Sequence, residues 1–186
     1  MDRDAVVEET RRWIANVVVG LNLCPFARKP FEGGLIRYAV TDATDADSLR
    51  GDLERELLAL VAVPEAEVET AFLIHPAALP DFLDFNDFVV GCDELLADLG
   101  LEGVVQLVGF HPQFRFASTR PDDVTNYTNR SPYPMLHLLR EDSVSRVNDD
   151  PAKVAEIPKR NMATLRRLGL AGVRSLLASR ERERPK

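Results

Sequence analysis

The sequence predicts an α/β fold with a small, mostly parallel sheet covered by N-terminal and C-terminal helices. Short apolar runs typical of buried strands alternate with longer segments of helical periodicity. The strand–helix–strand order repeats with short connections, which implies right-handed parallel crossovers. The 186 residues are 45% hydrophobic, enough for one core without disulfides or metal. A ferredoxin-like α+β arrangement is the alternative.

The first three elements follow from apolar spacing. Residues 4–20 have the periodicity of a helix, and residues 35–40 read as a short strand after a glycine turn. Residues 45–63 predict a second helix, capped by Thr44 or Asp45 and ended by a proline. Its expected buried stripe is Leu49, Leu53, Leu57, Leu60 and Val61.

The next elements continue the alternation. Residues 70–74 are almost continuously apolar, which is typical of a strand covered on both faces. Residues 81–99 predict a third helix that ends at Gly100 and places Cys92 in the core. Residues 104–110 predict another buried strand, so a β-α-β-α-β core results.

The following stretch is less regular. Phe114–Phe116 is a candidate short return strand, and residues 117–131 form a long polar loop. Loops of this length in a small domain are usually functional or disordered, and this one is rich in directed hydrogen-bonding groups. Ser131 sits where an N-cap belongs, with Pro132 at the first helical position, so a helix is expected up to about residue 147.

The chain is expected to form a single domain. One or two further helices follow a break at residues 148–151, with Gly169 and Gly172 as the points where they separate. Residues 1–178 therefore make one α/β domain with C-terminal helices, and residues 179–186 make a charged, solvated tail.

Charge and hydropathy exclude some classes of protein. The chain has 23 Lys and Arg against 30 Asp and Glu, a net charge of −7. This balance argues against a nucleic-acid partner, whose phosphates need a concentrated positive field, but it leaves room for a basic pocket that binds a small anion. No apolar run is long enough to span a bilayer, and the first residues lack the pattern of a signal peptide. We therefore expect a cytoplasmic protein with no membrane partner.

The three histidines are the most informative residues. His75 and His111 each follow a predicted strand, so parallel strands would bring both to the carboxyl edge of the sheet, where α/β folds bind ligands. His137 and Glu141 lie one turn apart on a predicted helix. His75, His111 and His137, with Glu141 completing the site, would suit zinc, iron or manganese. Alternatively, one histidine acts as an acid or base without a metal, or all three are structural.

Cys24 lies in a loop directly before Pro25. A cysteine in this position could be a nucleophile, a metal ligand, an axial haem ligand or simply a small buried residue. The sequence shows no feature that stabilises its thiolate.

The polar loop supplies a candidate anion site. Asn126, Asn129 and Arg130 immediately precede the predicted helix N-terminus, whose free N–H groups attract anions. Arg130 would pair with a carboxylate or phosphate, and Arg115 would contribute. The alternative is that these side chains only satisfy the backbone of the loop.

Three segments carry a family resemblance: Leu23–Ala27, Phe110–Pro112 and the long run Asn126–Glu141. Together they resemble a bacterial family catalogued as domain of unknown function 1415, over nearly the whole chain. The resemblance implies a bacterial, cytosolic protein. It brings no activity, catalytic residue, cofactor or substrate.

The residue chemistry favours a small cytosolic enzyme that acts on a small anionic molecule at the carboxyl edge of the sheet. We expect a metal-dependent hydrolase or oxidoreductase that uses the histidines, Glu141 and Arg130. Two alternatives stay open. One is a non-catalytic protein that binds a small anion. The other is a metal-free thiol enzyme in which Cys24 is the nucleophile and a nearby histidine the base.

Overall fold

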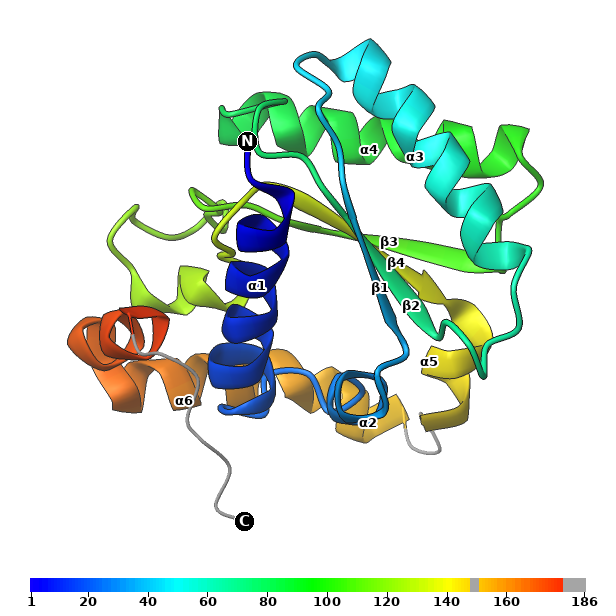
Figure 1. The fold of residues 1–186 in the computed structure, drawn as a ribbon. Helices are drawn as coiled ribbons and strands as arrows, with labels where there is room; N and C mark the ends of the chain where they lie inside the picture. The colour runs from blue at the N-terminus through cyan, green and yellow to red at the C-terminus, as the bar shows by residue number, and fades with distance from the viewer. Residues whose placement is uncertain (148–150, 179–186) are drawn as a thin grey trace.

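The computed structural model describes residues 1–147 and 151–178 and has a sheet between two layers of helices (Figure 1). The expected tail at 179–186 and most of the break at 148–151 lie outside the described residues. In chain order the elements are α1 (Arg3–Trp13), the π-helix η1 (Ile14–Val19), α2 (Arg28–Gly33), β1 (Ile36–Val40), α3 (Ala46–Val61), β2 (Thr70–Ile74), α4 (Phe82–Asp98), β3 (Val105–Phe110), the 3-10 helix η2 (Val124–Thr128), β4 (Met135–Arg140), α5 (Glu141–Val147) and α6 (Pro151–Ala178).

The first three strands and the helices between them are confirmed. Asp45 caps α3 by accepting the Ser48 N–H at 2.8 Å, and Asp81 caps α4 in the same way. Gly100 takes a φ of 66° just after α4, a left-handed conformation that glycine adopts without strain. Local capping chemistry therefore sets the start of α3 and both ends of α4, the two helices of the upper layer in Figure 1.

The sheet is mixed, so the expectation of a mostly parallel sheet is wrong in its detail. Its strand order is β1-β2-β4-β3. β1 and β2 are parallel neighbours, whereas β4 runs antiparallel to both β2 and β3. A ferredoxin-like sheet is antiparallel throughout, so the β1–β2 pair excludes that alternative as well.

The helix predicted after Ser131 is wrong over its first half, because residues 135–140 form the central strand β4. Pro134 disfavours helical backbone at the residue before it, and the pair Pro132 and Pro134 keeps the chain extended as it enters the sheet. Leu136 and Leu138 are both fully buried, as befits a strand with a helix layer on each face.

The candidate return strand at Phe114–Phe116 does not form. The Phe114 N–H donates to the His111 carbonyl oxygen, and the Phe116 N–H donates to the side chain of Asn126. These amides are therefore satisfied inside the loop rather than by a neighbouring strand. The expected break in the C-terminal helices is confirmed at Gly169, whose φ of 70° and ψ of 167° are not helical.

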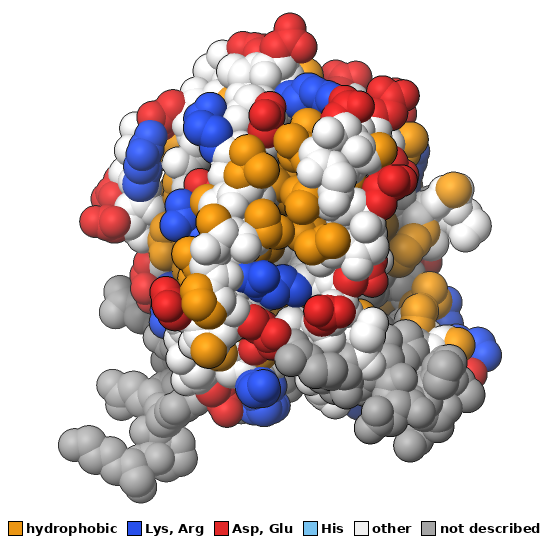
Figure 2. Space-filling model, turned by 90° about the vertical axis from the view of Figure 1, so that its right-hand side faces the viewer, with side chains coloured by type: hydrophobic (Ala, Val, Ile, Leu, Met, Phe, Trp, Pro, Cys, Tyr) orange, Lys and Arg blue, Asp and Glu red, His pale blue; other side chains and the backbone are white. Residues whose placement is uncertain are grey.

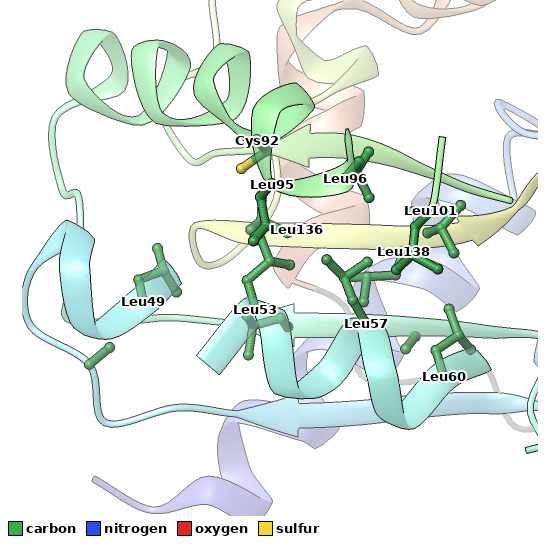
Figure 3. Packing of buried hydrophobic residues seen from close by; sticks show 14 of the residues in the cluster. Leu49, Leu53, Leu57, Leu60, Cys92, Leu95, Leu96, Leu101, Leu136 and Leu138 are labelled. Carbon is green, nitrogen blue, oxygen red and sulfur yellow. The ribbon is translucent and has the colours of Figure 1, made fainter. Parts of the chain in front are cut away.

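The core has one cluster on each face of the sheet. Between the sheet and the upper helices, Cys92 and the leucines of α3 and α4 meet the side chains of β4 (Figure 3). Cys92 is only 2% exposed, which confirms its expected core position, and burial raises the pKa of its thiol to about 11. On the other face, Trp13, Ile14 and Val17 pack against Phe72 and Met135.

The surface mixes side chains of all types. On the face drawn in Figure 2, hydrophobic side chains gather near the centre and are surrounded by acidic and basic groups. In the described part of the chain, no helix has both the length and the apolar character needed to cross a membrane.

Leu53→Ala should destabilise the protein strongly. Leu53 is fully buried in the core on the α3 side, so truncation removes apolar contacts and leaves a cavity that costs about 2–5 kcal/mol. Urea unfolding followed by circular dichroism measures the loss. Leu58→Ala is the matched control on the same helix, where the side chain is 45% exposed, and it should change stability by less than about 1 kcal/mol. Equal losses of stability in the two variants would contradict the packing of the Leu53 face of α3 in the core.

Candidate functional site

The two strand-end histidines lie at one edge of the sheet, as the sequence indicates. β2 and β3 both run antiparallel to β4, so their carboxyl ends meet at the same edge. They are not neighbours, however, because β4 lies between them. His75 donates its backbone N–H to the Pro134 carbonyl oxygen, and His111 donates its own to that of Asn129. The loop before β4 is thus tied to both strand ends.

Both imidazoles bind carbonyl oxygens of one short segment. His75 Nδ1 lies 3.1 Å from the Ala78 carbonyl oxygen, and His111 Nε2 lies 3.2 Å from that of Leu79. His111 Nδ1 accepts the Gln113 N–H at 3.0 Å, so its Nε2 carries the proton and donates. Both nitrogens of His111 are therefore engaged, and His75 has only Nε2 left without a partner.

The ring of Phe85 packs between the two histidines, with centroid distances of 5.6 Å to His75 and 5.1 Å to His111. It can approach because Gly109 has no side chain. A Cβ there would come within 2.9 Å of the Phe85 ring. Burial lowers the pKa of His75 to about 4 and also lowers the pKa of His111. The two neutral imidazoles therefore hold the loop before α4 in place through packing and through hydrogen bonds to its carbonyl oxygens.

His137 is not part of this group, so the expected three-histidine metal site does not form. His137 lies within β4, where its ring stacks on Phe72 at 4.0 Å on the sheet face that carries α1. His75 instead packs against α4 on the opposite face. Glu141 begins α5, and its N–H donates to the Val104 carbonyl oxygen. Among residues 1–147 and 151–178, no three His, Cys, Asp or Glu side chains are grouped to hold a metal ion.

The expected anion site at a helix N-terminus is also absent, because no helix begins at Ser131. Asn126 is fully buried and braces the loop. Its Oδ1 accepts the Phe116 N–H and the Thr119 hydroxyl, while its Nδ2 donates to the Arg120 carbonyl oxygen. Asn129 contributes its carbonyl oxygen to His111. For Asn126, the side chain thus satisfies backbone groups of the loop, as the structural alternative expects.

Arg130 braces the same loop through its guanidinium group. Nε donates to the Phe114 carbonyl oxygen at 3.0 Å and Nη2 donates to that of Pro121 at 2.7 Å. The guanidinium also lies over the Tyr127 ring, 4.9 Å from its centroid. Arg115 is exposed and lines a shallow cleft together with Arg130 and Asp81.

A different cavity brings two of the predicted residues together. Cys24 and His137 both line a space of about 70 Å³ enclosed by α1, η1, the Cys24 loop, one face of the sheet and α5. Apart from Thr70, Glu69 and Ser143, the rest of its lining is apolar. The apolar lining residues are Trp13, Ile14, Val18, Phe26, Ala27, Pro30, Ile36, Phe72, Phe110, Leu139 and Val144.

The loop that carries Cys24 is held from two sides. The Leu23 N–H donates to the Val18 carbonyl oxygen at 2.9 Å, which continues the wide turn of the π-helix. From α6, Asn161 Nδ2 donates to the Leu23 carbonyl oxygen at 2.7 Å, and Arg160 donates to that of Asn22 at 3.1 Å. The position of the thiol therefore depends on two elements far apart in sequence.

The thiol of Cys24 rests protonated. Burial raises its pKa above the ordinary value, while the backbone N–H groups of Phe26 and Ala27 and the charge of Arg160 act in the opposite direction. The Ala27 N–H donates to the Cys24 carbonyl oxygen at 3.3 Å, and both N–H groups lie near enough to favour negative charge on the sulfur. The cavity thus holds a neutral thiol beside donors that favour a thiolate once charge develops.

His137 presents a defined tautomer. Thr70 Oγ1 lies 2.6 Å from the Leu138 carbonyl oxygen and donates its single proton there. At 2.7 Å from His137 Nε2, the same hydroxyl can then only accept, so Nε2 carries the proton and Nδ1 keeps its lone pair. Burial lowers the pKa of His137 to about 3, so the imidazole stays neutral.

The sequence interpretation missed Thr70 as the partner of His137, because it placed His137 on a helix. It also gave no role to Trp13, which lines the same cavity as Cys24 and His137. The closely spaced prolines before Met135 are the signal that could have revealed the strand, and with it the pairing of Phe72 opposite His137.

The chain belongs to the family described as "Protein of unknown function (DUF1415)", which it matches over residues 5–175. This confirms the family resemblance of the sequence. No curated protein and no solved structure shows a significant match.

Acid should weaken the fold through the buried histidines. Their folded pKa values, about 4 for His75 and about 3 for His137, lie below the ordinary value of 6.5, so the unfolded chain binds protons first as the pH falls. The contribution of these two histidines to the free energy of unfolding is fully present above about pH 6.5. It should fall between pH 6.5 and 5, by up to about 1.4 kcal/mol per pH unit for each histidine. Urea unfolding across this range measures it. His137→Gln should reduce the slope, and an unchanged slope would contradict the assignment.

Arg130→Ala should lower stability, because it removes the donors to two loop carbonyl oxygens. We expect a loss of about 1–3 kcal/mol. The matched control is Arg115→Ala, at an exposed position on the same loop, which should have little effect. Thermal unfolding of both variants distinguishes them. A neutral Arg130→Ala would mean that Arg130 does not brace the loop.

Proposed function

We propose that this chain is a metal-free thiol enzyme in which Cys24 forms a covalent bond with a small electrophilic substrate. The observation that carries the proposal is the shared cavity, in which a thiol and a neutral imidazole with a lone pair line the same apolar space. Nucleophile, base and a third group that orients the base are the parts of a covalent catalytic site. Here the third group is Thr70, which fixes the tautomer of His137.

The proposed chemistry is acyl transfer with general-base assistance. The Cys24 sulfur attacks the carbonyl carbon of an activated ester as His137 Nδ1 accepts the thiol proton. The proton then passes to the departing alcohol, and water later releases the acid from the thioester. A raised thiol pKa and a lowered imidazole pKa mean that no thiolate–imidazolium pair exists before substrate binds. Cys24 and His137 are therefore both neutral before substrate binds, like the hydroxyl and the imidazole of serine hydrolases.

The cavity limits the group that enters it. Its volume of about 70 Å³ is about half of the ~150 Å³ cavity known to hold benzene in another protein. A short aliphatic acyl group fits, whereas a nucleotide or a large cofactor does not. The apolar lining also disfavours a charged acyl group, since burying an unpaired charge is costly.

The metal-dependent hypothesis has less support. His111 uses both ring nitrogens within the protein, and His137 faces the other side of the sheet. A metal would have to rely on His75 Nε2 with ligands that the sequence interpretation did not name.

We also propose a bacterial, cytosolic location. Cys24 and Cys92 are both free, and the proposed chemistry requires Cys24 to remain a thiol. Reducing compartments keep thiols in that state.

Acylation by p-nitrophenyl acetate tests the proposal. We expect release of p-nitrophenol together with an acetyl group on Cys24, located by mass spectrometry. His137→Gln should slow acylation by about 100-fold, the smaller end of the usual contribution of a general base. Cys24→Ser should abolish the adduct.

Two controls make the result decisive. Cys92 is an internal control, because this buried thiol should stay unmodified in the same sample. N-acetylcysteine, compared at equal thiol concentration, gives the rate of an unassisted thiol. If Cys24 reacts no faster than N-acetylcysteine, or if His137→Gln reacts like the wild type, the proposed function is wrong.

A further inference from the structure

A second cleft shares one wall with the thiol cavity. It has a volume of about 240 Å³ and lies between α1, the loop before β4 and the C-terminal part of α6. Trp13 lines both this cleft and the Cys24 cavity. Arg12 and Arg130 line the cleft from opposite elements, and Leu176 contributes apolar surface.

The cleft carries an excess of positive charge in an acidic protein. Arg12 and Arg130 contribute two guanidinium groups, and Glu9 is the single carboxylate in the lining. That carboxylate accepts the Tyr133 hydroxyl. Neither arginine forms an ion pair with any residue of the described ranges 1–147 and 151–178, and the partners of Arg130 are neutral carbonyl oxygens and a ring.

A buried donor on Trp13, the residue that the two cavities share, lacks an acceptor. Trp13 is 3% exposed, and its indole Nε1–H has no hydrogen-bond partner in the described part of the chain. An indole nitrogen can only donate, so what it lacks is an acceptor oxygen. Buried polar groups are normally paired, and each exception calls for an explanation. A bound anion would supply the oxygen.

We propose that this cleft binds a small carboxylate with an apolar body, held by Arg12, Arg130 and the Trp13 indole. The carboxylate carries one negative charge, which matches the one net positive charge of the lining. Leu176, Pro112 and Tyr127 offer apolar surface for the rest of the ligand. A cavity of ~150 Å³ admits a benzene ring, so about 240 Å³ admits a six-membered ring with a carboxylate. The inference goes beyond the proposed thiol chemistry and does not depend on it.

Titration with cyclohexanecarboxylate, followed by tryptophan fluorescence, tests the site. Trp13 is the single tryptophan of the chain, so the signal comes from the cleft wall itself. We expect saturable binding of cyclohexanecarboxylate and none of the neutral cyclohexanecarboxamide. Arg12→Gln should weaken binding about tenfold or more, the usual effect of losing a charge-assisted hydrogen bond.

Matched variants separate this site from general charge and from the thiol cavity. Arg11→Gln changes the net charge equally, yet Arg11 lies over Phe31 and Tyr38 outside the cleft, so it should bind like the wild type. Trp13→Phe removes the N–H donor together with part of the buried ring, and calorimetry should show weaker binding. Cys24→Ser should leave binding unchanged even if the thiol chemistry fails.

Several outcomes would overturn the proposal. Equal affinity for the carboxamide would show that the negative charge is irrelevant. Equal weakening by Arg11→Gln and Arg12→Gln would show only non-specific attraction. Tighter binding of inorganic phosphate than of the carboxylate would assign the arginines to a different ligand class. Binding that is lost in Cys24→Ser but kept in Arg12→Gln would place the ligand in the thiol cavity.

Discussion

The insertion of β4 between β2 and β3 is the constraint on which the rest of the structure depends. Because β4 is antiparallel to both neighbours, it begins at the edge of the sheet where β2 and β3 end, and the segment between β3 and β4 lies at that edge. The connection is the long polar loop, and the side chains of Asn126 and Arg130 bind several of its backbone groups. The insertion also buries His137 on the α1 face and separates it from His75 and His111.

Burial gives the three histidines different uses even though all three are neutral. His75 and His111 bind the carbonyl oxygens of Ala78 and Leu79. Their imidazoles thus satisfy backbone groups of a segment that lies outside the sheet. His137 has a hydroxyl as its partner, and its other nitrogen keeps a lone pair beside a cavity. A pKa lowered by burial therefore accompanies a structural role in His75 and the proposed proton-acceptor role in His137. The hydrogen-bond partners distinguish the two cases.

Most local structure could be predicted from the sequence, because capping residues and apolar spacing act over a few residues. Asp45, Asp81 and Gly100 occupy the positions that their chemistry predicts. The position of β4 could not be predicted in the same way, since strand pairing is a tertiary choice and six mostly apolar residues suit a helix or a strand equally well. Most of the errors about the site follow from that one element. That Cys24 and His137 line one cavity depends on how the α1 layer packs onto the sheet, which no local pattern encodes.

Trp13 connects the two sites because its indole belongs to the walls of both. Its ring meets Phe110 edge-on at 5.2 Å, so it is fixed against the sheet. The indole thus separates the apolar space that we propose for a short acyl group from the cleft that we propose for a carboxylate. A ligand that fills the cleft would contact the same ring that bounds the thiol cavity, and any shift of that ring would alter the space next to Cys24. The packing of Trp13 against Phe110 and Ile14 is therefore the physical connection through which one site can affect the other.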